Sequence, residues 1–132
     1  MNTLRAVFIL AMLAAAARPA AAQAYDRHGH ALVRDAHGWV YVDRDRRPIL
    51  RPYIYDNGPD YFEEGLARFV QDGKMGFHDE TLAVVIPARY DFAFPFENGV
   101  ARVGMRCKSR QHGEHSSVQC EQWQALARPP SR

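Results

Sequence analysis

The sequence lacks features that several large functional classes require. It has two cysteines in 132 residues, and its 17 lysines and arginines outnumber its 15 aspartates and glutamates by only two. So small an excess provides no basic surface for nucleic acid. The single long apolar run is shorter than the roughly 20 residues of a membrane-spanning helix. Phosphate-binding Gly-rich loops, the G-x-S-x-G of serine hydrolases and the zinc motif H-E-x-x-H are also missing. The chain therefore offers no signature of a known catalytic class.

The apolar run lies near the N-terminus and has the pattern of a secretory leader. Arg5 gives the segment a positive start, residues 6–17 are apolar, and a stretch of small residues ends at Ala24. This order is typical of a signal peptide. We expect residues 1–24 to be cleaved after Ala24, with Ala22 as the second candidate site. A periplasmic or secreted protein with no stable membrane anchor would result, formally neutral because the leader holds two arginines and no acid.

The rest of the chain repeats itself. Residues 62–69 (FEEGLARF) match residues 96–103 (FENGVARV) position by position at a spacing of 34. The pattern P-x-x-Y-D of residues 52–56 recurs at residues 87–91. We interpret this as two units, since self-similarity at such a period marks a repeat architecture. The expected organisation is an N-terminal segment at 25–36 with an unstructured start, units at 37–70 and 72–103, and a region at 104–132 that holds a cysteine loop, a partial third repeat near 119–126 and a disordered tail.

Both units have the pattern of short strands separated by turns. Alternating side chains around Trp39 and the β-branched run 82–86, which ends at Pro87, are typical of strands. The prediction is an all-β fold, an antiparallel meander of short strands. Positions that recur in both units are assigned structural roles, with aromatic rings in the core, aspartates accepting turn amides and glycines at positive φ. These positions are Tyr55, Asp56, Phe62, Gly65, Tyr90, Asp91, Phe96 and Gly99.

Three motifs of the second unit resemble the WG-repeat family. They are GKMGFHD at 73–79, VVIPARYD at 84–91 and FENGVARV at 96–103. At the positions of the Trp-Gly pair that names the family, this chain has Met75-Gly76 and Trp39-Val40. The resemblance implies β-rich tandem repeats, often on exported bacterial proteins, with no shared catalytic residues. It covers most of residues 37–103, gives two repeats plus a partial third, and brings no cofactor with it.

The two cysteines are expected to form a disulfide. Cys107 and Cys120 flank a polar loop, 108–119, and an even cysteine count in an exported chain favours a bond. Closing such a loop contributes roughly 3 kcal/mol in the chain-entropy model. The alternatives are two free thiols or a redox site, and the second is disfavoured because the C-x-x-C spacing is absent.

The histidines suggest no metal site. His28 and His30 lie in the start of the mature chain, and His112 and His115 lie in the cysteine loop. Two short pairs on loops are a weak signal, because a metal site needs converging ligands with an ordered surround. We expect solvated loop histidines and place His78 on the surface.

Three functions remain to be compared. The favoured one is a non-enzymatic binding or accessory module of the cell envelope, whose partner is an unknown envelope protein or polymer. The others are an envelope hydrolase with an Asp/Glu/His site assembled by folding, and a metal-handling protein using the loop histidines. Residues repeated in every unit are those that build the unit. Function is therefore expected where the units differ, at 57–61 against 92–95 and in the loop 108–119.

Overall fold

The structure, a computed structural model, describes residues 24–130. The predicted signal peptide falls outside these residues apart from Ala24. Strands and no helix occur in the described residues, and every strand pair is antiparallel, which confirms the all-β prediction. The strands are β1 (Ala31–Asp35), β2 (Gly38–Val42), β3 (Pro48–Pro52), β4 (Ile54–Tyr55), β5 (Gly58–Pro59), β6 (Ala67–Gln71), β7 (Lys74–His78), β8 (Val84–Tyr90), β9 (Phe92–Ala93), β10 (Val100–His112) and β11 (His115–Ala127).

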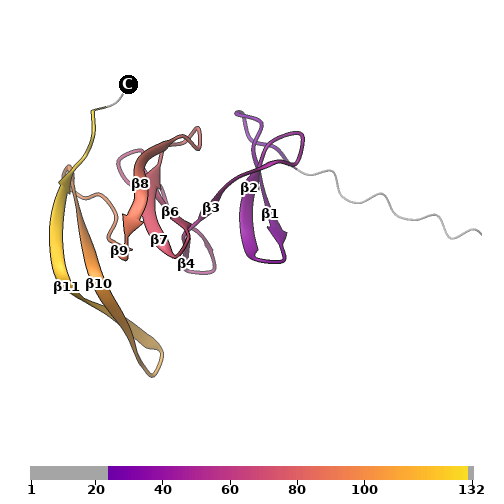
Figure 1. The fold of residues 1–132 in the computed structure, drawn as a ribbon. Coiled ribbons are helices and arrows are strands. Elements are labelled where there is room, and N and C mark those ends of the chain that lie inside the picture. Colours follow the sequence, from indigo (N-terminus) through magenta and orange to yellow (C-terminus); the bar gives the residue numbers. More distant parts are fainter. Residues whose placement is uncertain (1–23, 131–132) are drawn as a thin grey trace, which may run out of the picture.

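The strands form two sheets and one small ribbon. The larger sheet has the order β1-β2-β3-β6-β7-β8, the smaller one has the order β11-β10-β9, and β4 pairs with β5 alone. In Figure 1 the hairpins stand in a row in chain order, from β1-β2 to β10-β11. Neighbours in sequence are thus neighbours in space, as in a meander. Among the described residues, no helix long and apolar enough to cross a membrane occurs.

The segment at 25–36 belongs to the fold, so its expected unstructured start is a wrong prediction. β1 lies within it and pairs with β2 from Ala31 opposite Val42 to Asp35 opposite Gly38. The β1-β2 hairpin is the structural counterpart of the β6-β7 hairpin, in which Ala67 begins the first strand. Both alanines are buried. β1 is therefore a structural counterpart of β6, although the sequence match left it outside the first unit.

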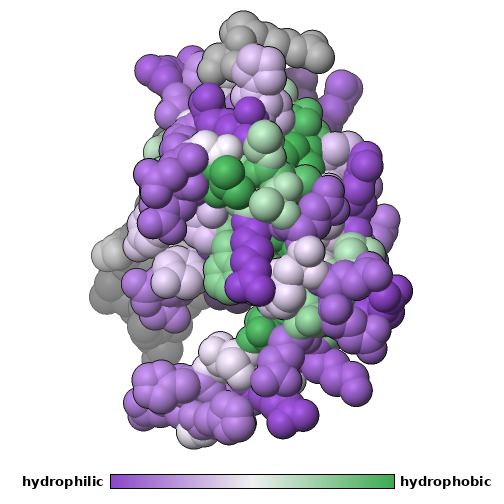
Figure 2. Space-filling view, turned by 90° about the vertical axis from the view of Figure 1, so that its left-hand side faces the viewer, coloured by the Kyte–Doolittle hydropathy of each residue, from purple (hydrophilic) through white to green (hydrophobic). Residues whose placement is uncertain are grey.

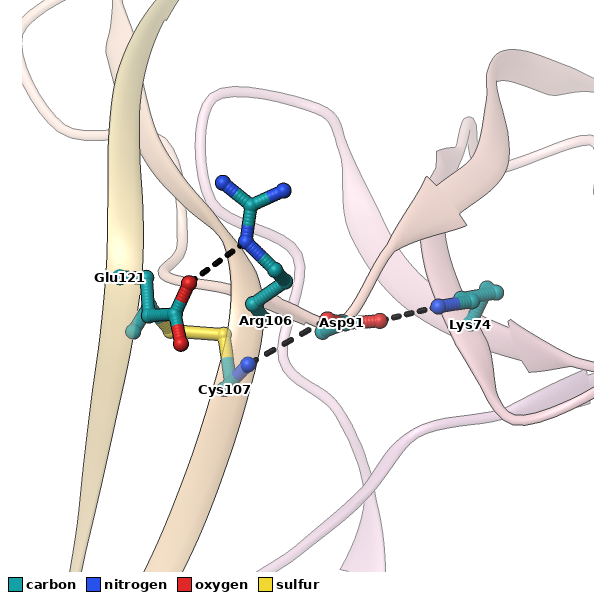
Figure 3. The surroundings of a disulfide bond; sticks show 6 residues. Lys74, Asp91, Arg106, Cys107 and Glu121 are labelled. Carbon is teal, nitrogen blue, oxygen red and sulfur yellow. Dashed lines mark hydrogen bonds and ion pairs between the residues drawn. A yellow bond between two sulfur atoms is a disulfide. The ribbon is translucent and has the colours of Figure 1, made fainter.

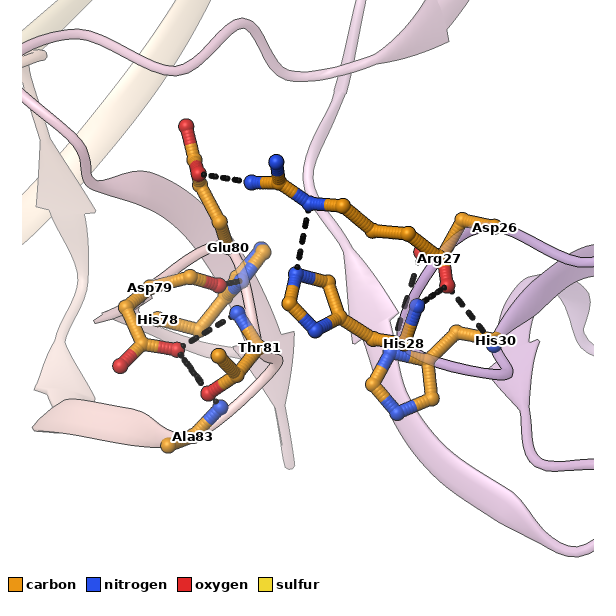
Figure 4. A network of polar contacts seen from close by, with 9 residues as sticks. All are labelled: Asp26, Arg27, His28, His30, His78, Asp79, Glu80, Thr81 and Ala83. Atoms are coloured by element: carbon orange, nitrogen blue, oxygen red, sulfur yellow. Dashed lines mark hydrogen bonds and ion pairs between the residues drawn. The ribbon is translucent and has the colours of Figure 1, made fainter.

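Three turns of the chain have the same pattern of hydrogen bonds to an aspartate side chain. The carboxylates of Asp26, Asp43 and Asp79 each accept hydrogen bonds from the backbone N–H groups two and four residues further on. Each backbone N–H of these aspartates donates in turn to the carbonyl four residues on. Asp and Asn favour turns because their short side chains reach these amides. The two copies at Asp26 and Asp79 face each other, linked by an Arg27–Glu80 ion pair of 3.1 Å (Figure 4).

The glycines predicted to turn the chain at positive φ do so. Gly65 has φ 80° and Gly99 has φ 77°, and the residues before them, Glu64 and Asn98, are also at positive φ. Two consecutive residues of this kind make a type I′ turn, which fits the twist of the flanking strands. The two turns are joined, because the Gly99 N–H donates to the Glu64 carboxylate at 2.9 Å. The predicted turn assignment is confirmed.

The core joins the second unit to the strand that follows it. Phe77 of β7 and Phe96 are both buried, and their ring centroids lie 4.8 Å apart in an edge-to-face arrangement. Val103 of β10 packs in the same cluster. The prediction that Phe96 lies in the core is therefore correct. Its counterpart in the first unit, Phe62, is 39% exposed, so the same prediction for Phe62 is wrong.

The two units differ because their third strands take different paths. β3 leaves β2 early and pairs with β6, with Pro52 opposite Phe69. β8 stays with β7 as far as Tyr90, and only then does the chain pair with β10 as β9. The residues that the first unit does not use in the sheet form the β4-β5 ribbon. Tyr55 lies in this ribbon and is 52% exposed, so its predicted core position is wrong, whereas Tyr90 is half-buried against the core.

The matched aspartates also have different surroundings. Asp91 accepts a hydrogen bond from the Lys74 ammonium and one from the Cys107 backbone N–H at 3.3 Å. The Lys74 ammonium holds the pKa of Asp91 below its usual value. Within the described residues, the Asp56 side chain accepts no hydrogen bond. The backbone N–H bonded to Asp91 lies 16 residues further on in β10, so the predicted turn bond is wrong at both positions. The motif Y-D is therefore shared in sequence and not in structure.

Gly76 keeps the glycine of the Trp-Gly pair for a steric reason. A Cβ atom at this position would lie 2.4 Å from the Ile86 carbonyl oxygen and 2.7 Å from the ring of Phe69. Real Cβ atoms do not approach backbone so closely, so β7 and β8 can pack here only around a glycine.

We predict that Gly76→Ala lowers the free energy of unfolding by about 1–3 kcal/mol, because the added methyl overpacks the core. The control is Gly58→Ala, since a Cβ at Gly58 meets no atom within 4 Å and φ there is not positive. Urea unfolding of both variants measures the difference. Equal stabilities would contradict the steric explanation.

His78 is buried, so its predicted surface position is wrong. It is 1% exposed, and its ring lies edge-on to Phe62 at 5.4 Å and to Phe69 at 6.2 Å. Its Nδ1 donates to the Asp79 carbonyl oxygen at 2.8 Å. Burial lowers the pKa of His78 below its usual 6.5, because the charged form is poorly solvated there. The equivalent residue of the first unit is the buried Val42.

We predict that the protein loses stability as the pH falls below about 6.5. The unfolded chain then binds a proton at His78 that the folded chain excludes, so stability rises with pH across this window. Urea unfolding between pH 5 and 7 measures the slope. In His78→Val the slope should flatten, whatever the cost of the substitution at pH 7. An unchanged slope in this variant would contradict the assignment.

Candidate binding site at the second unit

In the first unit, the chain bends at Tyr53, after β3, where the Tyr53 N–H donates to the Arg68 carbonyl, and we call this bend the corner of the unit. A buried ion pair closes it. Arg68 of β6 and Asp60 are both nearly inaccessible, with side-chain exposures of 5% and 3%. The Asp60 carboxylate accepts from Nε of Arg68 at 2.8 Å, from its terminal nitrogen at 2.7 Å and from its backbone N–H at 2.8 Å. A buried pair needs this degree of hydrogen bonding, because each ion has lost its water. The β4-β5 ribbon is what carries Asp60 to this position, since the Asp60 N–H donates to the Tyr53 carbonyl.

The same arginine links the first unit to the second. Its remaining guanidinium nitrogen donates to the Ala93 carbonyl oxygen of β9 at 2.9 Å. The guanidinium also lies over the ring of Tyr53, 4.6 Å from the centroid. Arg68 is thus surrounded by a carboxylate, a carbonyl and an aromatic face, and the Asp60 carboxylate compensates its positive charge inside the protein.

The corresponding arginine of the second unit is in a different situation. The Tyr53 N–H donates to the Arg68 carbonyl at 3.1 Å, and the Phe94 N–H donates to the Arg102 carbonyl at 2.8 Å, so the two corners have the same backbone pairing. The second unit has no ribbon and no counterpart of Asp60. Within residues 24–130, no carboxylate pairs with Arg102. Its guanidinium lies instead over the ring of Trp123, 4.1 Å from the centroid, and is exposed to solvent.

A cavity of about 770 Å³ opens at this second corner. The exposed ring of Phe94 lines it and stacks on Trp123 with a centroid separation of 5.8 Å. The side chains of Glu63, Glu97 and Asn98 also line it, and in the described part of the chain they form no hydrogen bond. The corner that is filled in one unit is therefore hollow in the other, and unused polar groups surround it.

The cysteine region is a long hairpin, so the predicted loop at 108–119 is wrong. β10 and β11 are paired from Val100 opposite Ala127 to His112 opposite His115, and the partial third repeat near 119–126 is its returning strand. The predicted disulfide is present, since Cys107 and Cys120 are bonded across the hairpin (Figure 3). Gly104 makes room for it, because a Cβ there would lie 2.3 Å from the Cys120 sulfur.

The hairpin beyond the disulfide projects from the body of the molecule (Figure 1). Almost all of its residues there are polar and exposed, with Val118 as an apolar, half-buried exception. Figure 2, which faces the β11 side, shows a largely hydrophilic surface with hydrophobic areas between the purple residues, the largest of them in the upper half. A two-stranded hairpin without an apolar face is marginal on its own. The disulfide, together with the Asp91 contact to Cys107, is what holds its base.

The histidine pairs do not converge on a site. His112 and His115 face each other at the exposed tip of the hairpin, and His28 lies beside His30 with ring centroids 6.1 Å apart. In residues 24–130, no group of three or more His, Cys, Asp or Glu side chains could hold a metal ion.

Sequence reasoning missed the residues that define the two corners. Arg68 and Trp123 were given no role, and Asp60 was included only as part of the stretch 57–61, since an arginine and an aspartate eight residues apart carry no motif. One sequence feature did indicate the site. The stretch 92–95, chosen because it differs from 57–61, contains Phe94 and lies in the open corner.

The fold and its paired hairpins define a class, an all-β protein built from tandem strand units. The family model described as WG containing repeat matches residues 39–74 and 75–106, just over half of the chain. The protein belongs to the WG-repeat family. No curated protein and no solved structure matches the chain.

We predict that Arg68→Met costs about 3–5 kcal/mol of unfolding free energy, because it leaves Asp60 charged and buried. The matched control is Arg102→Met, the same change at the equivalent position, which removes only an exposed cation–π contact of about 1 kcal/mol or less. Chemical unfolding of both variants measures the difference. Similar losses in both would show that the two corners are not different in the way described.

Proposed function

We propose that this WG-repeat protein is an exported, non-enzymatic binding or accessory module of the cell envelope. One observation carries the proposal. The polar side chains of the first corner, Asp60 and Arg68, are bonded to each other, whereas those that line the second corner form no hydrogen bond or ion pair within residues 24–130. A repeat protein keeps its shared residues for structure, and the place where one unit departs from the other is where a ligand finds free groups.

Two features support export. Residues 1–24 have the charged, apolar and small-residue pattern of a secretory leader. The Cys107–Cys120 disulfide is of the kind that persists in oxidising compartments such as the periplasm.

One observation favours a second candidate, the envelope hydrolase. Glu63 and Glu97 line the same cavity, and paired carboxylates are what glycoside hydrolysis uses. The corner also holds an arginine over a tryptophan, which supports binding more than proton transfer. Binding is therefore the favoured function, and catalytic turnover of a glycan would favour the hydrolase instead.

The first test expresses the chain with its own leader in a Gram-negative host and follows it by fractionation and intact mass. We expect a periplasmic product that begins at Tyr25, with no free thiol after denaturation without reductant. The control is Leu10→Arg, which breaks the apolar run and should leave an unprocessed product in the cytoplasm. A wild-type product that stays cytoplasmic and keeps residues 1–17 would contradict the export proposal.

A further inference from the structure

We propose that the cavity at the open corner binds a pyranose unit of an envelope glycan. This inference rests on the proposed function as a binding module and names the class of its ligand. It follows from three properties of the corner, namely an exposed aromatic ring, hydrogen-bonding groups of both kinds, and charges of both signs.

The first property is a firm aromatic surface. Phe94 is 41% exposed, and Trp123 backs it in a near-parallel stack with an interplanar angle of 28°. Val100, 44% exposed, continues the apolar wall. An aromatic ring supported from behind is a rigid flat surface, and such rings are favoured wherever a ligand has one apolar face. The C–H face of a pyranose is a ligand surface of this kind.

The second property is a set of hydrogen-bonding groups beside that ring. The carboxylates of Glu63 and Glu97 accept, the guanidinium of Arg102 donates, and the amide of Asn98 does both. Sugar hydroxyls also donate and accept, so they can satisfy all four. A ligand pocket is commonly an apolar wall with a few polar groups that fix orientation.

The third property is the balance of charge. Two carboxylates and one guanidinium meet at the cavity. A strongly anionic ligand would face the glutamates, and a strongly cationic one would face Arg102. Like-charge contacts of this kind are costly and exclude partners. A neutral polyhydroxylated ligand meets neither penalty.

A second cavity supports no such site. Its volume is about 590 Å³, and Asp79, Glu80 and Arg128 line it. Each of these side chains already makes a polar contact, because Asp79 holds its turn, Glu80 pairs with Arg27, and Nε of Arg128 donates to the Glu64 carbonyl at 2.7 Å. The open corner is where free groups and an exposed ring coincide.

The test titrates the mature protein, purified from the periplasm or refolded with its disulfide, with three oligosaccharides by calorimetry. The probes are the tetramers of N-acetylglucosamine, of β-1,4-linked glucose and of α-1,4-linked glucose, which separate an N-acetylated envelope glycan from plain glucans. We expect saturable binding of at least one tetramer. Phe94→Ala should weaken it about tenfold through loss of the stacking surface, and Arg102→Gln should weaken it as well. The matched control is Tyr61→Ala, an exposed aromatic of the first unit outside the cavity, which should bind as wild type.

The outcomes separate this inference from the proposed function. Absence of saturable binding with all three tetramers, or binding that Phe94→Ala leaves unchanged, would overturn the sugar site while leaving export and accessory function intact. Cleavage of a bound tetramer, abolished by Glu97→Gln with the melting temperature kept, would support the sugar site and overturn the non-enzymatic proposal. Binding that is weakened by Phe94→Ala and not by Tyr61→Ala, without cleavage, supports both.

Discussion

The buried pair of Arg68 and Asp60 is the interaction on which the arrangement of the two units depends. It places two charges where water cannot reach them, so the surrounding chain must supply every hydrogen bond they need. The β4-β5 ribbon brings the carboxylate, Tyr53 covers the guanidinium, and the Ala93 carbonyl of the next unit accepts from the third guanidinium nitrogen. The early exit of β3 from its pairing with β2 frees the residues that make the ribbon. The path of β3 and the position of the Asp60 carboxylate thus depend on each other.

The second unit has the same backbone pairing at its corner but no counterpart of the Asp60 carboxylate. Its strand remains in the sheet for longer, no ribbon forms, and the equivalent arginine turns outward to the ring of Trp123. Trp123 belongs to β11, the returning strand of the hairpin that the disulfide holds at its base. The hairpin therefore supplies both a projecting arm and the backing of the open corner. A structural position in one repeat has become a set of free groups in the next, which is how a repeat protein can acquire a single site.

Turn conformations and the disulfide could be predicted from the sequence, whereas the strand with which each segment pairs could not. Gly65 and Gly99 were predicted correctly because a type I′ turn demands positive φ from the chain itself. The disulfide could be predicted from the even cysteine count together with the expectation of export. Tyr55 and Tyr90 share a motif but lie in different places, because the segment that follows can pair with either neighbouring strand and only tertiary packing decides. His78 was misplaced for a related reason, since strand alternation puts it opposite Phe77 while a covering segment with Phe62 buries that face as well. The open corner was approached only through the difference between 57–61 and 92–95.

We propose that the open second corner binds its ligand beside Trp123. The most direct measurement uses the two tryptophans, because replacing the other one in Trp39→Phe leaves Trp123 as the sole indole reporter. The account predicts that a tetramer which binds by calorimetry changes Trp123 emission saturably, with the same dissociation constant by both methods. Binding by calorimetry with unaltered Trp123 emission, and with wild-type affinity in Phe94→Ala, would place the ligand elsewhere and contradict the account.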